Sequence, residues 1–128
     1  MVKKPACEML EEFNQAMLHF EKDYFGRDHV LAQTYFIQDM ILVRIRGILT
    51  PAEQKLAESR DGMFHVKDTR RQLFETARPM LEGIVRRVTG CRMISLHTDM
   101  STSSGERIVL FIVDANLETA QHSRNRLP

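Results

Sequence analysis

The spacing of apolar residues switches between helical and strand-like along this chain, and this pattern constrains the fold more than any other feature. Over Ala6–Phe25, apolar residues recur in steps of three and four, which predicts an amphipathic helix that ends at Gly26. Two strand-like stretches follow, residues 30–37 and 40–48, with a tight turn at Gln38-Asp39 between them. The apolar stripe of the helix consists of Leu10, Phe13, Met17, Phe20 and Tyr24. A short coiled coil has the same spacing, but two heptads are too few to indicate one.

The clearest local signal is a helix start at Thr50-Pro51-Ala52-Glu53. Thr50 is a typical N-cap residue, and Pro51 stands where a missing N–H needs no partner. Glu53 follows the cap by three residues, which completes a capping box. We therefore expect a short helix over residues 51–59, ended by Asp61-Gly62.

A longer helix is expected over residues 64–88, with a kink at Pro79 because proline removes one backbone hydrogen bond. Residues 91–99 and 107–113 predict two further strands, joined by a polar loop. In the first of these strands Ser95, His97 and Asp99 share one face, and Leu96 and Thr98 lie on the other. The apolar stripe of the long helix consists of Val66, Leu73, Ala77, Leu81, Ile84 and Val88.

The order of the expected elements is helix, hairpin, helix pair, hairpin. This order predicts one α+β domain over residues 1–128, built from two helix-hairpin units. Its sheet should have four mainly antiparallel strands with the helices packed on one face. Asp39-Met40 and Asp99-Met100 recur at the two hairpins, which suggests a degenerate repeat. We expect an ordered core over about residues 6–114 and a polar tail over residues 115–128.

Composition argues against several kinds of partner. The net charge is +1, from 18 basic and 17 acidic residues, so the whole molecule has no strong attraction to nucleic acid or an anionic membrane. The longest apolar run, residues 108–113, is far shorter than the ~20 residues that span a bilayer. Two cysteines, Cys7 and Cys91, without a CxxC pair suit a reducing cytoplasm. We expect a cytoplasmic protein that does not insert into a membrane and does not bind nucleic acid.

Metal binding and catalysis are not favoured by the residue pattern. His97 and Asp99 are two apart on one predicted strand, but two ligands are too few for a metal site. Together with Ser95, they make up the serine, histidine and aspartate of a hydrolase triad. However, alternate side chains of a strand stand about 6 to 7 Å apart, beyond the reach of a proton relay. We therefore expect no catalytic residue, no metal and no cofactor.

Ligand binding has a clearer set of candidates. Residues 101–107 form a small, hydroxyl-rich segment that ends in arginine, and the backbone amides of such a loop can hold an anion. A simple hairpin turn is the alternative, since the spacing is not that of a P-loop. The candidate ligand-binding residues are Arg27, Arg44, His97, Ser103, Ser104, Gly105 and Arg107. Thr50, Pro51, Glu53 and Asp99 are expected to be structural, with Asp99 accepting hydrogen bonds from backbone amides of residues 101–104.

Several short segments occur together in one order. They are Phe20-Glu21-Lys22-Asp23-Tyr24-Phe25-Gly26-Arg27, Asp39-Met40-Ile41-Leu42-Val43-Arg44, Leu49-Thr50-Pro51-Ala52-Glu53, Ser95-Leu96-His97-Thr98-Asp99 and Gly105-Glu106-Arg107. Together they resemble the MpsC-like family of small bacterial proteins, named after a sodium-translocating, membrane-potential-generating system. The resemblance covers about residues 10–114. It implies a stand-alone cytoplasmic protein or accessory module, and it supplies no catalytic mechanism. The chain departs from the family pattern at Gly26-Arg27-Asp28-His29, where the family often has Gly-Arg-Gly-Pro.

Two functions remain open. The first is a non-enzymatic accessory or regulatory protein that acts through protein–protein association as a homodimer, with a possible link to a membrane ion-translocation system. The alternative is a sensor that binds a small molecule or anion. The first is favoured because both faces of the sheet carry apolar residues, and an exposed apolar face usually marks an interface. One face is expected to hold Ile41, Val43, Ile45, Val109, Phe111 and Val113. The other is expected to hold Leu42, Ile48, Ile94, Leu96, Ile108, Leu110 and Ile112.

Overall fold

A computed structural model describes residues 5–27 and 29–118 of the protein. Its helices and strands confirm the α+β class and the predicted order of two helix-hairpin units. The elements are α1 (Ala6–Phe25), β1 (Leu31–Ile37), β2 (Met40–Arg46), α2 (Pro51–Leu56), α3 (Arg60–Thr76), α4 (Arg78–Thr89), β3 (Met93–Ser101) and β4 (Glu106–Val113).

The four strands form one antiparallel sheet in the order β1-β2-β4-β3. Each hairpin therefore contributes its second strand to the centre, where Val43 of β2 pairs with Val109 of β4. Each hairpin is also preceded by a helix that contacts its first strand, α1 against β1 and α4 against β3. The two units are thus arranged in the same way around the centre of the sheet.

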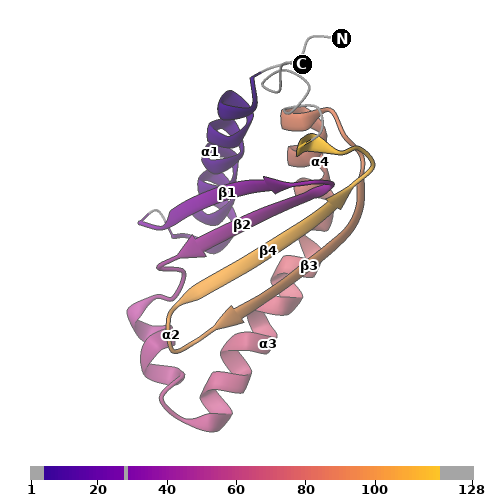
Figure 1. The fold of residues 1–128 in the computed structure, drawn as a ribbon. Helices are drawn as coiled ribbons and strands as arrows, with labels where there is room; N and C mark the ends of the chain where they lie inside the picture. Colours follow the sequence, from indigo (N-terminus) through magenta and orange to yellow (C-terminus); the bar gives the residue numbers. More distant parts are fainter. Residues whose placement is uncertain (1–4, 28, 119–128) are drawn as a thin grey trace.

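The helices lie on one side of the sheet and leave its other side open (Figure 1). Alternation along β4 reflects this arrangement, because Val109 and Phe111 are buried against the helices while Ile108 and Leu110 between them are half-buried. On α1 the buried Phe13 ring meets the Phe111 ring edge-on, with 5.4 Å between their centroids. The core of the molecule therefore lies between the helix layer and one face of the sheet.

Helix α1 has the predicted bounds and ends as expected. Gly26 adopts a left-handed backbone with φ of 72°, and its N–H donates to the Lys22 carbonyl. Glycine takes this conformation without the steric penalty that a β-carbon brings. Phe13, Met17 and Phe20 of the predicted stripe are buried.

The middle of the chain differs from the prediction. Asp61-Gly62 does not end a helix but lies in the first turn of α3, where Ser59 caps the helix by accepting a hydrogen bond from the Gly62 N–H. The predicted helix over residues 64–88 is two helices, α3 and α4, separated at Ala77. Pro79 lies in the first turn of α4, a position where its missing N–H costs no hydrogen bond. The proline therefore starts a helix and does not kink one.

The apolar stripe of α3 is also displaced by one residue. Leu73 is 40% exposed, whereas Phe74 is buried. The buried positions Val66, Arg70 and Phe74 follow one another in steps of four, so the buried stripe of α3 includes a charged residue.

Strand β3 begins at Met93 and extends to Ser101, beyond the predicted end at residue 99. A register shift between Met93 and Ser95 displaces Ile94 and changes which residues face the helices. As a result Leu96 packs against the core, so its predicted place on the open face was wrong. Ile48 is likewise buried, because β2 ends at Arg46 and the chain turns into the core.

The ordered chain continues past the predicted end of the core at residue 114. Leu117 is buried, and its N–H donates to the Gln38 carbonyl in the β1–β2 turn. The Gln38 N–H in turn donates to the Glu118 carboxylate. The first residues of the predicted tail thus pack on the first hairpin, while residues 119–128 lie outside the described part of the chain.

Two helical glycines allow a matched test of this packing. A β-carbon at Gly62 would overlap the carbonyl oxygen of Leu56 and lie 2.8 Å from the Ser59 hydroxyl, so backbone must move. We predict that Gly62→Ala lowers the free energy of unfolding by about 1 to 3 kcal/mol. A β-carbon at Gly83 meets nothing within 4 Å. Gly83→Ala should therefore raise stability by roughly 0.5 to 1 kcal/mol.

Urea denaturation of both variants measures the two effects. Equal stability changes in the two variants would show that the α2–α3 junction is packed differently from this description.

Candidate functional site

A buried arginine joins α3 to the end of the sheet. Arg70 is 3% exposed, and its Nε and Nη2 donate to the two carboxylate oxygens of Glu53 at 2.9 and 2.8 Å. Nη2 also donates to the Ile48 carbonyl at 2.8 Å. A bidentate pair of this kind fixes direction as well as distance. It sets the position of α3 relative to α2 and to the segment that follows β2.

Glu53 takes part in a second set of contacts that confirms the predicted capping box. Its carboxylate accepts a hydrogen bond from the Thr50 N–H, while its own N–H donates to the Thr50 hydroxyl. Burial alone would raise the pKa of Glu53, but hydrogen bonds from Arg70 and Thr50 outweigh burial and hold the pKa below its ordinary value. The capping residue is thus also the anion that binds Arg70.

A second arginine is buried between the sheet and α3. Arg107 on β4 is 1% exposed, and its guanidinium lies over the Phe74 ring at 4.6 Å. Nη1 donates to the Thr98 hydroxyl at 3.0 Å, and Nη2 lies 4.0 Å from the Met100 sulfur. Nε is buried without a hydrogen-bond partner among the described residues. Burial lowers the pKa of Arg107 to about 10.

The buried acid near these arginines is Glu21 of α1. Its side chain is fully buried, and within the described chain neither carboxylate oxygen has a hydrogen-bond partner. Burial raises the pKa of Glu21, while the charges of Arg107 and Arg70 act in the opposite direction. The interior therefore holds two cations and one acid whose hydrogen bonds are incomplete.

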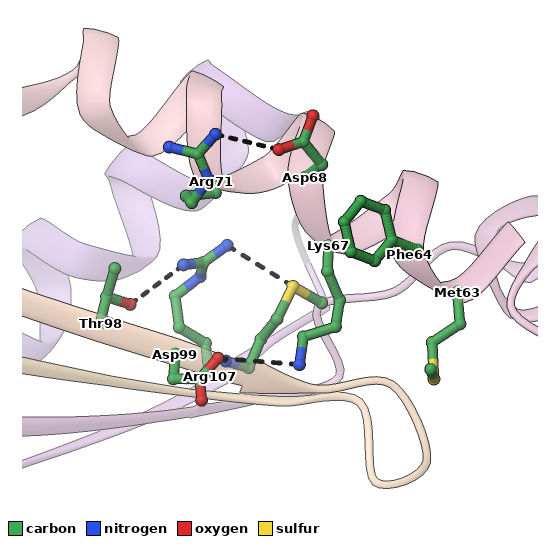
Figure 2. Close-up of a pocket in the computed structure, with 9 residues that line it drawn as sticks. Met63, Phe64, Lys67, Asp68, Arg71, Thr98, Asp99 and Arg107 are labelled. Carbon is green, nitrogen blue, oxygen red and sulfur yellow. Dashed lines mark hydrogen bonds and ion pairs between the residues drawn. The ribbon is translucent and has the colours of Figure 1, made fainter. Parts of the chain in front are cut away.

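A cavity of about 310 Å³ opens beside Arg107 (Figure 2). We call it the α3 cavity, because α3 forms one wall and the β3–β4 hairpin forms the other. Its lining residues are Met63, Phe64, Lys67, Asp68, Arg71, Thr98, Asp99, Met100 and Arg107. Figure 2 shows the Arg107 guanidinium on the inner side, close to Thr98, with side chains of α3 across from it.

Charged side chains at the rim of the α3 cavity are largely paired with one another. Arg71 donates to Asp68 one turn earlier at 2.9 Å. Lys67 lies 3.9 Å from the Asp99 carboxylate, a looser contact between exposed groups. Arg107 differs from both, since none of its hydrogen bonds or ion pairs within the described residues involves a carboxylate. Arg107 is therefore a cation of the cavity wall without a close carboxylate partner in the described chain.

Two arginines predicted to bind a ligand make other contacts. Arg27 donates through Nε and Nη2 to the Gly47 carbonyl at 3.1 and 2.9 Å. Arg44 points to the open side of the sheet, where it pairs with Glu106 at 2.8 Å. Neither residue lines the α3 cavity.

The hydroxyl-rich loop forms a hairpin turn. The Ser104 N–H and the Ser103 hydroxyl both lie within hydrogen-bonding distance of the Ser101 hydroxyl, and Gly105 adopts a φ of 67°. The Gly105 carbonyl accepts hydrogen bonds from the N–H groups of Gly47 and Ile48. The loop is thus tied to the segment after β2, and Arg107 lies apart from it in the core.

The predicted hydrogen bonds of Asp99 are wrong. Its carboxylate accepts from the N–H of the adjacent Met100 at 2.8 Å, while Ser101 supplies the acceptor for the Ser104 amide. Asp99 is 86% exposed, so the exposed carboxylate does not hold the turn together. A serine two residues later holds it.

The predicted separation of Ser95 and His97 is also wrong. Ser95 and His97 lie on the same side of β3, and the long His97 side chain brings its Nε2 to 3.2 Å from the Ser95 hydroxyl. Asp99 does not continue this chain of contacts, because its partners are Met100 and Lys67. Among residues 5–27 and 29–118, no group of three or more His, Cys, Asp or Glu side chains is placed to hold a metal.

Sequence reasoning missed most of the cavity, although signals for its buried charges exist. Glu21 follows Met17 by four residues and therefore lies on the apolar stripe of α1. Arg107 lies two residues before Val109 and four before Phe111, so it shares the core-facing side of β4 with them. Lys67 and Phe64, by contrast, have the spacing of an ordinary exposed helix face, and only the packing of α3 brings them to β3.

A model of the family described as "Na+-translocating membrane potential-generating system (MpsC)" matches residues 6–115. The chain belongs to the MpsC family. Among its relatives, Uncharacterized protein YbcI of Bacillus subtilis (strain 168) is 38% identical over 117 residues, which cover 91% of this chain and 94% of the relative. Uncharacterized protein YrhF of the same organism is 22% identical over 111 residues, 85% of this chain and 90% of the relative. No solved structure matches the chain.

None of the described helices of this MpsC protein is both long enough and apolar enough to cross a membrane. The family match includes both hairpins and all residues of the α3 cavity.

The raised pKa of Glu21 predicts a pH dependence with a definite sign. The folded chain keeps the Glu21 proton to a higher pH than the unfolded chain, whose carboxyl has its ordinary value of 4.5. The stability that Glu21 contributes should therefore be lost as the pH rises from about 4.5 through the raised pKa, and the difference between wild type and Glu21→Gln isolates it from the opposite contribution of Glu53. Glu21→Gln should lack this loss, whereas the exposed Glu82→Gln should follow the wild type.

The measurement is chemical denaturation of the three proteins between pH 4 and 8. Parallel stability curves for wild type and Glu21→Gln would mean that burial does not control this carboxyl group.

Proposed function

We propose that this MpsC protein is a non-enzymatic accessory or regulatory protein that acts through protein–protein association, and that its first partner is a second copy of itself. The observation that supports the proposal is the open face of the sheet. At its centre Leu42 of β2 and Leu110 of β4 are cross-strand partners, and both are only half-buried. Tyr35, Ile37, Met40, Ile108 and Ile112 flank them on the same side. Polar residues border this apolar centre on that side, namely Gln33, Arg44, Arg46, Ser95, His97, Asp99 and Glu106.

An apolar sheet face of this kind is typical of an interface, since a monomer gains nothing by exposing it. Antiparallel sheets of soluble monomers usually alternate apolar residues with polar ones, and the polar ones face water. Here the second set of residues on β4 is also apolar, with Ile108, Leu110 and Ile112 in succession. Association through this face would remove these side chains from water.

The charges at one end of the open face fit a two-fold dimer. In a face-to-face pair whose axis runs parallel to the strands, β2 of one copy lies over β4 of the other. Arg46 of one copy then faces Glu106 of the second copy, and the same contact occurs twice. Both residues are accessible on the open side, where Arg46 already lies 3.7 Å from Glu106 of its own chain. The Arg46–Glu106 contact would thus recur between the copies, while Arg44 keeps its own pair with Glu106 at 2.8 Å.

The family description gives the proposed setting. We assign this protein a cytoplasmic accessory role beside a sodium-translocating membrane system, consistent with its two free cysteines, Cys7 and Cys91. Recognition of the membrane partner would use surfaces that the dimer leaves free, such as the outer side of the helix layer (Figure 1).

Substitution at the centre of the open face tests the association. Leu110→Lys places two charges in the apolar interface of a two-fold dimer, so we predict that it weakens self-association by about a hundredfold or more. Sedimentation velocity across a concentration series measures this change, and far-ultraviolet circular dichroism checks that the fold is retained. The matched control is Leu73→Lys, because Leu73 is also exposed but lies on α3.

A wild-type protein that stays monomeric at tens of micromolar would contradict the proposal. So would a Leu73→Lys variant that dissociates as readily as Leu110→Lys.

A further inference from the structure

We propose that the α3 cavity is a binding site for a small organic carboxylate, whose anionic group is recognised by Arg107 and whose apolar body lies against Phe64 and Met63. This inference goes beyond self-association and does not rest on it, because Arg107, Thr98 and Met100 face the helix layer and not the open side of the sheet. The volume of about 310 Å³ is at the small end of the range of ligand sites.

The deep part of the cavity supplies a cation with unused donors. A guanidinium has five N–H groups, and Arg107 uses one on the Thr98 hydroxyl and a weak contact on the Met100 sulfur. The whole residue is only 1% exposed, and its Nε is buried without a hydrogen-bond partner in the described chain. A buried charged donor without a partner is costly, so Arg107 carries a positive charge in the cavity wall that no fixed carboxylate of the described chain pairs with closely.

The charge of the lining favours a monoanion. Lys67, Arg71 and Arg107 are cationic, while Asp68 and Asp99 are acidic, which leaves an excess of one positive charge. The two acids are already in contact with Arg71 and Lys67 at the rim. A phosphate dianion would meet the nearby carboxylates with twice the charge, whereas a planar carboxylate matches the fork of a guanidinium.

The outer part of the cavity supplies an apolar surface. Phe64 is 73% exposed although it is a large aromatic residue, and it lies in the wall of the cavity next to Lys67 (Figure 2). Met63 lines the same wall, and flexible methionine side chains adapt to ligands of varied shape. An inorganic anion would leave this surface in water, but an aliphatic or aromatic carboxylate would cover it.

Calorimetric titration with sodium benzoate and sodium hexanoate tests the site, with inorganic phosphate at equal ionic strength as the comparison. We expect dissociation constants of about 0.1 to 1 mM for the carboxylates and no saturable heat with phosphate. Lys67→Gln and Phe64→Ser, both at accessible positions, should each weaken carboxylate binding by about fivefold or more. Their matched controls, Lys22→Gln on α1 and Leu73→Ser on the outer side of α3, should bind like the wild type.

Arg107→Lys keeps the positive charge but loses the planar guanidinium that can donate two parallel hydrogen bonds to a carboxylate. A folded Arg107→Lys variant should therefore bind about tenfold or more weakly. The proposal is overturned if neither carboxylate binds at 10 mM, if phosphate binds as well as benzoate, or if the Lys67 and Phe64 variants bind like the wild type. Carboxylate binding can be measured on either the monomer or the dimer. A protein that does not bind carboxylates would therefore contradict the ligand proposal without contradicting self-association.

Discussion

The arrangement of this protein depends on Arg70, a buried cation that contacts three other parts of the chain at once. It donates to the carboxylate of Glu53 in α2, donates to the Ile48 carbonyl after β2, and lies 4.9 Å from the Phe25 ring at the end of α1. Burial of a cation costs less free energy when a fixed anion accompanies it. Glu53 is fixed because it also closes the capping box of α2. Local capping and long-range packing therefore depend on the same carboxylate.

The position of α3, fixed by Arg70, also determines what covers the neighbouring sheet residue Arg107. Arg107 takes a core position on β4, covered by Phe74 and contacting Thr98. Its nearby acid, Glu21, is buried without hydrogen bonds, so the two charges interact across the interior without forming a close pair. Hydrophobic packing of the same volume would be more stable in many proteins. The incomplete pairing of Arg107 and Glu21 is therefore not what maximal stability of the fold would select.

The sequence was sufficient for elements defined by local signals. Helical spacing with Gly26 defined α1, the capping box defined the start of α2, and alternation defined the strands. Pro79 was misinterpreted because the same proline chemistry permits a kink or a new helix, and packing at Ala77 decides between them. The bulge beside Ile94 depends on strand pairing, which no local pattern contains. The α3 cavity joins residues some thirty positions apart, so its existence requires the tertiary contact between α3 and β3.

The central claim is that two copies associate through the open face, with β2 of one over β4 of the other. Methyl-labelled and unlabelled protein mixed in equal amounts allows nuclear Overhauser effects between copies to be observed separately from those within a copy. The account predicts intermolecular cross-peaks between the methyl groups of Leu42 and Leu110, which lie at the centre of this face. Intermolecular cross-peaks from Leu73 on α3 in place of these, or no intermolecular cross-peaks at millimolar concentration, would contradict it.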